Sequence, residues 1–152
     1  MFRIPYLLIK NRLESIPELK IIDIDLGQDT NQFKGGVKAT PMVLINFRPI
    51  NPNSLGKNEQ QGILEFEVKL ITSVSHSSDK RLSENTPLNH FELLDKIHHH
   101  LQKWAGNTKQ LEGGNDMKVT GSANRTYIDY LNTHDSLMRS LMRYQCTVKD
   151  TG

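Results

Sequence analysis

Four histidines lie in the segment "HFELLDKIHHHLQKW", residues 90–104, and imidazole rings bind metal ions or transfer protons. A metal site on one helix requires two ligands three or four positions apart, as in the HExxH zinc motif. His98, His99 and His100 are consecutive, so on a helix they point about 100° apart and do not converge on one ion. Asp95 and His99 have the required spacing, but no obvious acid–histidine cluster supplies further ligands. The segment therefore indicates the polar face of an ordinary helix, and we predict no metal site.

Two aspartates and one cysteine are the other candidates for chemistry. Asp23 and Asp25 lie two residues apart, so on a strand they share one face, as a catalytic carboxylate pair can do. Alternating acids are also common on the solvent side of a strand, where they have no catalytic role. Cys146 lies in a strand-like stretch without a neighbouring basic motif, which favours a structural thiol over a nucleophile. We therefore predict no catalytic and no cofactor-binding residues.

Motifs that bind phosphates or nucleotides are missing from the sequence. Gly35-Gly36 and Gly113-Gly114 are isolated pairs and belong to neither a GxxxxGK[ST] nor a GxGxxG motif. No GxSxG hydrolase motif is present. The aromatic residues do not alternate with basic ones as they do in stacking platforms for nucleic acids. The sequence thus predicts no cofactor.

Composition places the chain among folded domains of ordinary size. Its length of 152 residues suits one domain. Hydrophobic residues make up 36% of the chain and charged residues 24%. The formal net charge is +2, which is too small to indicate the clustered basic surface of a nucleic-acid-binding protein. One cysteine excludes an internal disulfide and fits a compartment in which disulfides are not used.

The first residues, "MFRIPYLLIKNRLESIP", do not resemble a secretion signal. Their apolar run is interrupted by Pro5 and ends at Lys10, and no small-residue cleavage site follows. No stretch reaches the roughly 18 apolar residues that a membrane span needs. We therefore expect a soluble protein without a membrane partner that does not follow the usual export route.

Periodicity in the first half of the chain predicts one helix and two strands. Apolar residues at helical spacing indicate a helix over 6–16, which Pro17 ends. Alternation indicates a half-buried strand over 19–26, followed by a long loop over 27–40. Residues 42–48 are apolar on both faces, as in a strand that is covered on both sides.

The clearest element follows a second loop over 49–61. Residues 63–72 alternate strictly, which indicates an antiparallel strand with one face in water. A helix over 88–105 is predicted, and Gly106 would end it. Its apolar stripe, with intervals of three and four, consists of Leu88, Phe91, Leu94, Ile97, Leu101 and Trp104.

The last third of the chain is less regular. Residues 107–135 are mostly loop, with a short strand around Met117–Thr120. Residues 137–150 alternate and suggest a final strand, and a helix over 135–143 is the alternative, because Leu137 and Leu141 also fit helical spacing. The β-forming residues after Arg143 favour the strand.

These elements predict the fold class. We expect a single domain, residues 1–152, of the α/β (α+β) class. It should contain a mostly antiparallel sheet of about 4–5 strands, with two amphipathic helices packed against it.

The order of the elements also carries a resemblance to a known family. The segments are "YLLIKNRLESIPELK", "IIDIDLGQ", "TPMVLINFRP", "QQGILEFEVKLIT", "NHFELLDKIHHHLQKWAG" and "LMRSLMRYQCTVKD". From residue 6 to residue 150, this pattern resembles the tail terminator and tail-completion proteins of tailed bacteriophages, which include minor tail and head–tail joining proteins. The long stretch 107–135 departs from the compact members of that family.

The resemblance implies a structural virion protein and not an enzyme. Such proteins form rings, usually homohexamers, that cap the tail tube and connect the tail to the head. The implied partners are further copies of this chain, the tail tube protein and a head-completion or connector protein. DNA would pass through the lumen without sequence-specific binding, which a small net charge permits. The protein would be assembled in the host bacterial cytoplasm and would lie at the head-proximal end of the virion tail.

Two other readings remain open from the sequence. One is a small adaptor domain that binds another protein as a monomer or dimer. The other is an enzyme that uses Asp23, Asp25 or the histidine helix. For an assembly protein, we expect contacts through loops 27–41, 49–61 and 107–135, and pairing between subunits along an edge strand such as 63–72 or 137–148.

Overall fold

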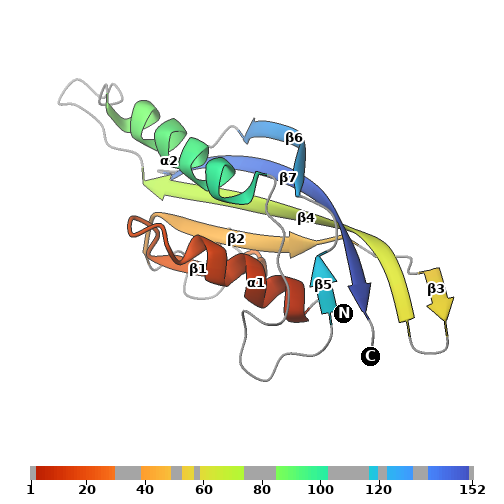
Figure 1. Cartoon of the computed structure of the whole chain (residues 1–152). Coiled ribbons are helices and arrows are strands. Elements are labelled where there is room, and N and C mark those ends of the chain that lie inside the picture. The colour runs from red at the N-terminus through yellow and green to blue at the C-terminus, as the bar shows by residue number, and fades with distance from the viewer. Residues whose placement is uncertain are drawn as a thin grey trace.

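The computed structural model describes residues 3–29, 39–48, 53–56, 59–73, 85–102, 117–119, 123–131 and 137–150. These residues form two helices and seven strands (Figure 1). In chain order the elements are α1 (Arg3–Leu13), β1 (Ile21–Ile24), β2 (Met42–Phe47), β3 (Asn53–Gly56), β4 (Glu59–Ser73), α2 (Asn85–Leu101), β5 (Met117–Val119), β6 (Asn124–Leu131) and β7 (Leu137–Asp150). A mostly antiparallel sheet with two helices confirms the predicted fold class.

The sheet has a central path of five strands, in the order β1-β2-β4-β7-β5. β3 pairs with the beginning of β4, and β6 pairs with β7 beside β5. β1 and β2 are parallel, whereas every other described pair is antiparallel. The longest ladder joins β4 to β7 and runs from Gln60↔Asp150 to Ser73↔Leu137.

This order corrects the expectation that residues 63–72 or 137–148 lie at an edge of the sheet. Both strands are central, because β4 lies between β2 and β7, and β7 lies between β4 and the strands β5 and β6. The strand pairing gives both strands neighbours on two sides, and their buried faces lie under the helices. Within the described residues, the edges are instead β1 and the short β3 on one side and β5 with β6 on the other.

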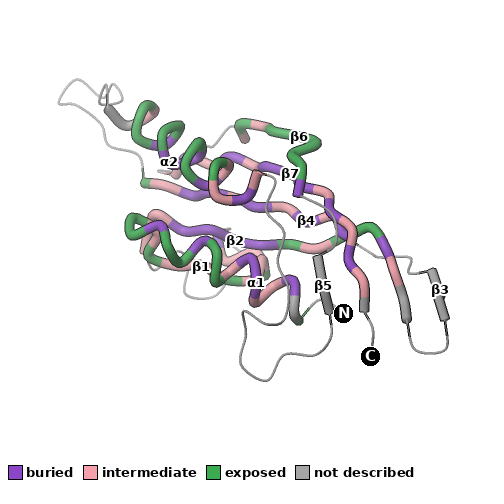
Figure 2. Tube along the Cα trace, viewed as in Figure 1, coloured by how far each residue is buried: buried purple, intermediate pink, exposed green. Residues whose placement is uncertain are grey.

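Both helices pack on the same face of the sheet. Figure 1 shows α1 and α2 side by side in front of the strands. Figure 2 shows buried residues both along these helices and along the central strands behind them. Alternate residues of β2, β4 and β7 form the floor of this core, in agreement with the one-sided burial predicted for 63–72. A second, smaller cluster on the opposite face, around Met42, Leu44 and Ile71, buries the other side of β2. The prediction that residues 42–48 are covered on both sides is thus confirmed for Met42 to Ile45.

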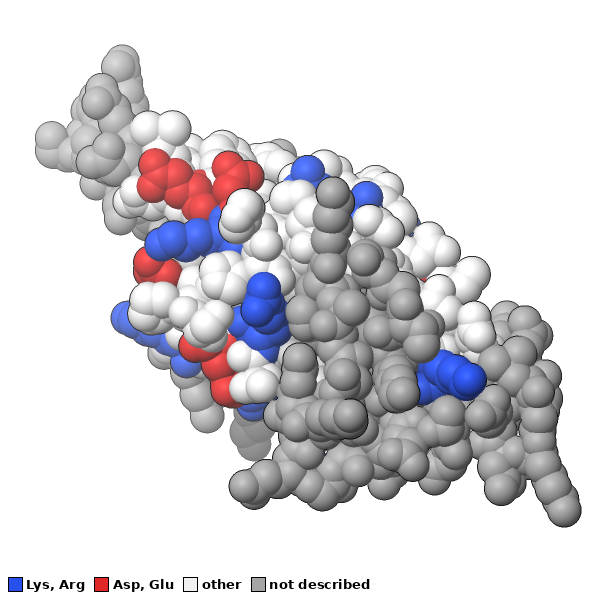
Figure 3. All heavy atoms as spheres, viewed as in Figure 1, with Lys and Arg blue, Asp and Glu red and all other residues white. Residues whose placement is uncertain are grey.

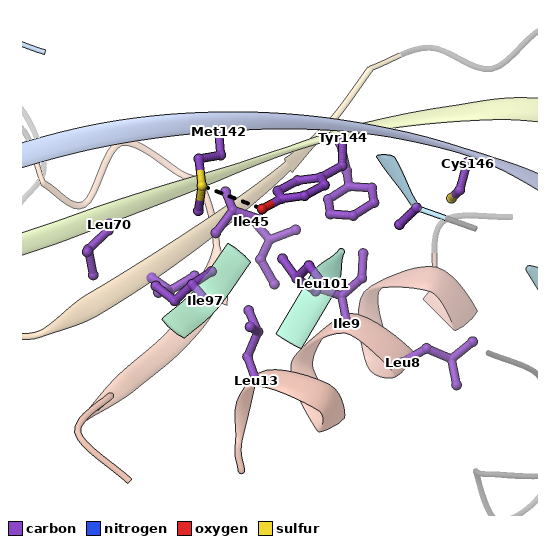
Figure 4. Packing of buried hydrophobic residues seen from close by; sticks show 14 of the residues in the cluster. Leu8, Ile9, Leu13, Ile45, Leu70, Ile97, Leu101, Met142, Tyr144 and Cys146 are labelled. Carbon is purple, nitrogen blue, oxygen red and sulfur yellow. Dashed lines mark hydrogen bonds between the residues drawn. The ribbon is translucent and has the colours of Figure 1, made fainter. Parts of the chain in front are cut away.

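The centre of the core is aromatic. The rings of Phe66 on β4 and Tyr144 on β7 stack with their centroids 5.3 Å apart. The Tyr144 hydroxyl also contacts Met142 Sδ at 3.5 Å (Figure 4). Leu13 of α1 and Ile97 of α2 pack over these strands, so both helices share one core. Stacked aromatic pairs of this kind add about 0.5–1.5 kcal/mol beyond the burial of their surface.

The register of α2 differs from the predicted stripe at its beginning. Leu88 and Phe91 were expected to face the core, but both side chains are exposed. The helix begins at Asn85, and its buried face runs instead through His90, Leu93 and Leu94 before it reaches Ile97 and Leu101. His90 faces the sheet because Thr72 and Ser140 are its hydrogen-bond partners there. With His90 in this position, the side chain of Phe91 lies at the side of the helix and not against the core. Trp104 and Gly106 lie outside the described residues.

Several element boundaries also differ from the predicted ones. α1 begins at Arg3 instead of residue 6, and β1 is limited to Ile21–Ile24. β4 extends back to Glu59 and pairs with β3, so part of the predicted loop 49–61 is a polar hairpin. The described part of loop 27–40 contains no helix or strand.

The predicted loop over 107–135 contains a strand that the sequence did not reveal. β6 pairs with β7 from Asn124↔Gln145 to Leu131↔Arg139. Its side chains are mostly exposed on both faces, so no alternation of apolar and polar residues marks it. The short strand around Met117 is confirmed as β5, and β7 confirms the strand over 137–150 against the helix alternative.

Candidate functional site

The three consecutive histidines of α2 make separate contacts. His98 is half-buried, its Nδ1 lies 2.9 Å from the Tyr144 hydroxyl, and burial lowers its pKa. His99 is exposed. His100 donates from Nδ1 to the carbonyl oxygen of Lys96 at 2.8 Å. Their side chains thus diverge, and the described residues contain no group of three His, Cys, Asp or Glu side chains that could hold a metal ion.

The two aspartates of the β1 region satisfy local groups. Asp23 accepts a hydrogen bond from its neighbour's backbone, the Ile24 N–H, at 2.8 Å. Asp25 accepts the Gly27 N–H at 2.9 Å and lies 3.4 Å from Lys69 Nζ. Gly27 has a φ of 81°, which glycine adopts without a steric penalty. These contacts shape the turn after β1, and they give the carboxylates structural partners.

Cys146 lies on the helix-covered face of β7 and is buried. Burial raises the pKa of its thiol to about 12, because the thiolate would be removed from water. Almost none of the thiol is therefore ionised at neutral pH, which suits a packing role.

The sequence did not predict an ion-pair network that lies on the face of the sheet opposite the helices. Asp29 is buried, and Arg139 of β7 binds it twice, with Nε 2.7 Å from Oδ2 and Nη2 2.6 Å from the Asp29 carbonyl. Lys69 Nζ lies 3.6 Å from Asp29 Oδ1. These groups are far apart in sequence, and neither Asp29 nor Arg139 stands in a motif. The network attaches the segment after β1 to the middle of the sheet.

A second ion pair lies further along the same face. Arg143 contacts Glu67 Oε1 through Nε at 3.2 Å and Nη2 at 2.9 Å. The Arg143 guanidinium also lies over the ring of Tyr127 on β6, 5.0 Å from its centroid. The Tyr127 hydroxyl donates to Asp129 at 3.1 Å, which raises the pKa of the phenol. These contacts fix β6 against β7 where packing alone is sparse.

A pocket of about 470 Å³ opens beside α2 and the end of β4. His90 lines it, yet only 1% of this residue's surface is exposed. His90 Nδ1 lies 2.7 Å from Thr72 Oγ1, and Nε2 lies 2.7 Å from Ser140 Oγ. Burial lowers the pKa of His90 to about 4, so the ring is neutral at pH 7. A serine beside a histidine suggests a nucleophile, but Ser140 is fully buried, and the three groups form an internal polar clamp.

Exposed apolar side chains gather where α2 meets β6. We call Leu88, Phe91, Ile128 and Tyr130 the β6 patch; their exposed fractions are 59%, 41%, 49% and 46%. The rings of Phe91 and Tyr130 meet edge to face with centroids 5.9 Å apart. Exposed apolar side chains that adjoin one another, as Phe91 and Tyr130 do, are typical of interaction sites in folded proteins.

The opposite edge of the sheet carries a shallow hollow of about 590 Å³. We call it the β1 hollow, and it is lined by Arg3, Tyr6, Asp23, Ile24, Asn46 and Phe47. It therefore joins the beginning of α1 to the ends of β1 and β2.

The charged side chains do not form a field of one sign on the face seen in Figure 3. Acidic side chains gather over α2, and basic and acidic side chains intermix over α1. None of the helices in the described residues has the length and apolar character to cross a membrane. The sequence matches no model of a known protein family and no curated protein.

Proposed function

We propose that this protein is a tail terminator or tail-completion protein of a tailed bacteriophage. In this role it forms a ring that caps the tail tube and connects the tail to the head. The resemblance in element order supports the proposal, and so does the confirmed fold class. The observation that carries most weight is the pair of exposed surfaces at opposite edges of the sheet, the β6 patch and the β1 hollow.

Rings need two different surfaces on each subunit. A head-to-tail contact repeats around an axis and closes when the rotation between neighbours is right. A single self-complementary surface gives only a two-fold dimer. The β6 patch and the β1 hollow lie on opposite sides of the molecule, as the positions of β6 and β1 in Figure 1 illustrate. The chain thus has the kind of asymmetry that a hexameric ring requires.

The proposed partners are the tail tube protein below the ring and a head-completion or connector protein above it. DNA passes through the lumen without being read. The formal net charge of +2 agrees with this, because many phosphate contacts would retard the passage of DNA. The protein is assembled in the bacterial cytoplasm and ends at the head-proximal end of the tail. It uses no cofactor in this role.

The polar groups of the described residues favour a structural role over catalysis. His90, Thr72 and Ser140 bind one another, and Asp29 binds Arg139. An active site needs groups that converge on a substrate, whereas these groups converge on each other. A small adaptor domain is the second candidate, since the β6 patch also suits a complex with one other protein.

Gold labelling of purified virions tests the proposed location. An antibody against this protein should place gold at the junction of head and tail, with about the same label on tails detached from heads. Label that is absent from virions, or spread along the tail, would contradict a terminator. Mutant particles that lack the protein should accumulate separate heads and tails, whereas normal particles without it would support the adaptor.

A further inference from the structure

We propose that neighbouring copies of this chain join head to tail, with the β6 patch of one copy packed into the β1 hollow of the next. This inference rests on the proposed function, which requires a ring, and it adds the two surfaces that meet. The partner is therefore a second copy of the chain.

The β6 patch has the character of an interface anchor. Its centre is the edge-to-face pair of Phe91 and Tyr130, and Tyr130 also lies edge to face with His90, at 6.4 Å. Hydrogen bonds to Thr72 and Ser140 fix the ring of His90, and this ring in turn restricts the conformation of the aromatic pair. Aromatic side chains held in one conformation lose little entropy on binding, and they contribute most of the energy in many interfaces.

The β1 hollow offers a matching surface. Tyr6 and Phe47 are half-buried in its wall, and both pack against the main core. The hollow is shallow and has a volume of about 590 Å³. The hollow is therefore large enough to receive the rings of Phe91 and Tyr130.

Charges beside the two surfaces are complementary. Asp95 lies one turn after Phe91 on α2, and Arg125 lies on β6, and both are exposed. The β1 hollow is bordered by exposed Arg3 and by Asp23. In the proposed contact, Asp95 of one copy pairs with Arg3 of the next, and Arg125 pairs with Asp23. Opposite charges at the rim set the orientation and the partner.

A symmetric contact between two β6 patches fits these observations less well. Such a dimer would close on itself by a two-fold axis and leave the β1 hollow uncovered. A head-to-tail contact covers both surfaces on every subunit of a closed ring. It also uses β1 and β6, two edge strands that have no further strand beside them among the described residues.

Alanine substitutions in the β6 patch test the first half of the interface. Phe91→Ala and Tyr130→Ala should each raise the concentration of half-assembly by about tenfold or more, measured by light scattering on the full chain. Ile63→Ala is the matched control, because Ile63 is 55% exposed on β4, on the other face of the sheet. Circular dichroism should show an unchanged fold for all three variants. Assembly that is insensitive to both patch substitutions would overturn the inference.

Charge reversal tests which surfaces meet. Asp95→Lys and Arg3→Glu should each weaken assembly severalfold, because each places like charges across the contact. The double variant Asp95→Lys/Arg3→Glu should assemble again. The two single variants, mixed in equal amounts, should also form rings in which they alternate, since a head-to-tail contact then pairs Lys with Glu and Asp with Arg. Additive loss in the double variant, and no assembly in the mixture, would overturn the pairing.

These outcomes are separable from those of the proposed function. Rings that survive every substitution overturn this interface, whereas gold at the head–tail junction would still support the terminator. A two-fold dimer that Phe91→Ala dissociates overturns the head-to-tail arrangement and favours the adaptor. A wild-type protein that remains monomeric at every concentration also overturns the interface, and the gold label then decides the function independently.

Discussion

His90 is the residue whose role differs most from its chemical reputation. It is one of four histidines in a segment that invites a metal or acid–base interpretation, and it is the one of the four that is fully buried. Its two ring nitrogens meet Thr72 and Ser140, so a neutral ring with one N–H satisfies both hydroxyls. The residue therefore joins α2 to β4 and β7 through hydrogen bonds inside an otherwise apolar layer.

Stability should consequently fall in mild acid because of His90. Its pKa is lowered from 6.5 to about 4 in the folded protein, so the unfolded chain takes up the proton first as the pH falls. The contribution is complete above pH 6.5 and is lost as the pH approaches 4, with a total of roughly 3 kcal/mol. Denaturant titrations between pH 7.5 and 4 would measure it. His90→Gln should lower stability at pH 7 and show a flatter pH dependence, and an unchanged dependence would contradict this assignment.

Cys146 should be inert in the native protein. The thiol is buried and its pKa is raised to about 12, so both access and ionisation limit its reaction with a disulfide reagent. We expect no labelling over hours at pH 8, and complete labelling once denaturant unfolds the chain. Rapid labelling of the folded protein would show that β7 opens locally at this position.

At the scale of elements, the contacts of β7 extend beyond its own strand ladder. Arg139 attaches the segment after β1 through Asp29, and Arg143 attaches β6 through Tyr127. Side chains of β7 thus bind segments at both edges of the sheet, the one after β1 and β6.

Removal of the Arg139 head group should be costly. Arg139→Met leaves the buried Asp29 carboxylate with Lys69 as its only cation among the described residues, and loss of one partner of a buried pair typically costs about 3–5 kcal/mol of unfolding free energy. Arg48→Met is the control, because the Arg48–Glu65 pair is exposed, and its loss should cost about 1 kcal/mol or less. Equal losses in urea titrations of the two variants would show that the network contributes no more than a surface pair.

β6 should exchange its amide hydrogens faster than β7. It pairs with one strand among the described residues, and its side chains are mostly exposed, so its local opening exposes little apolar surface. β7 has neighbours on both sides and a buried face, and its amides should exchange only through global unfolding. In the assembled protein, the amides of β6 should exchange more slowly than in the dissociated chain if a neighbouring copy covers that edge. Equal protection of β6 and β7 in the dissociated chain would contradict the difference.

At the scale of the whole molecule, periodicity predicted the fold class, both helices and the strands with a one-sided burial pattern. It missed β6, because a strand exposed on both faces carries no alternation. It misplaced Leu88 and Phe91, because a polar residue with partners in the sheet took the inward position on α2. Asp29 and Arg139 were also missed, since a contact between distant residues leaves no local pattern. The surfaces proposed for assembly therefore come from the structure and not from the sequence.

The assembled mass should depend on protein concentration and not on metal. Light scattering across a dilution series should show a transition from a small species to one ring-sized species, with the same masses in EDTA. A closed ring gives a single end state, whereas an unclosed head-to-tail contact gives masses that continue to grow. A change in mass upon chelation would revive a metal role for residues 90–104.

The ladder between β4 and β7 also has a consequence for folding on the ribosome. It pairs residues 60–73 with residues 137–150, so the centre of the sheet forms only after the last strand has been synthesised. Until then β4 has a free central edge, which invites pairing with other nascent chains. Contacts between residues so distant in the chain also slow folding. Expression at high rates should therefore favour inclusion bodies. Slower translation, or chaperones that bind nascent chains at the ribosome, should raise the soluble yield.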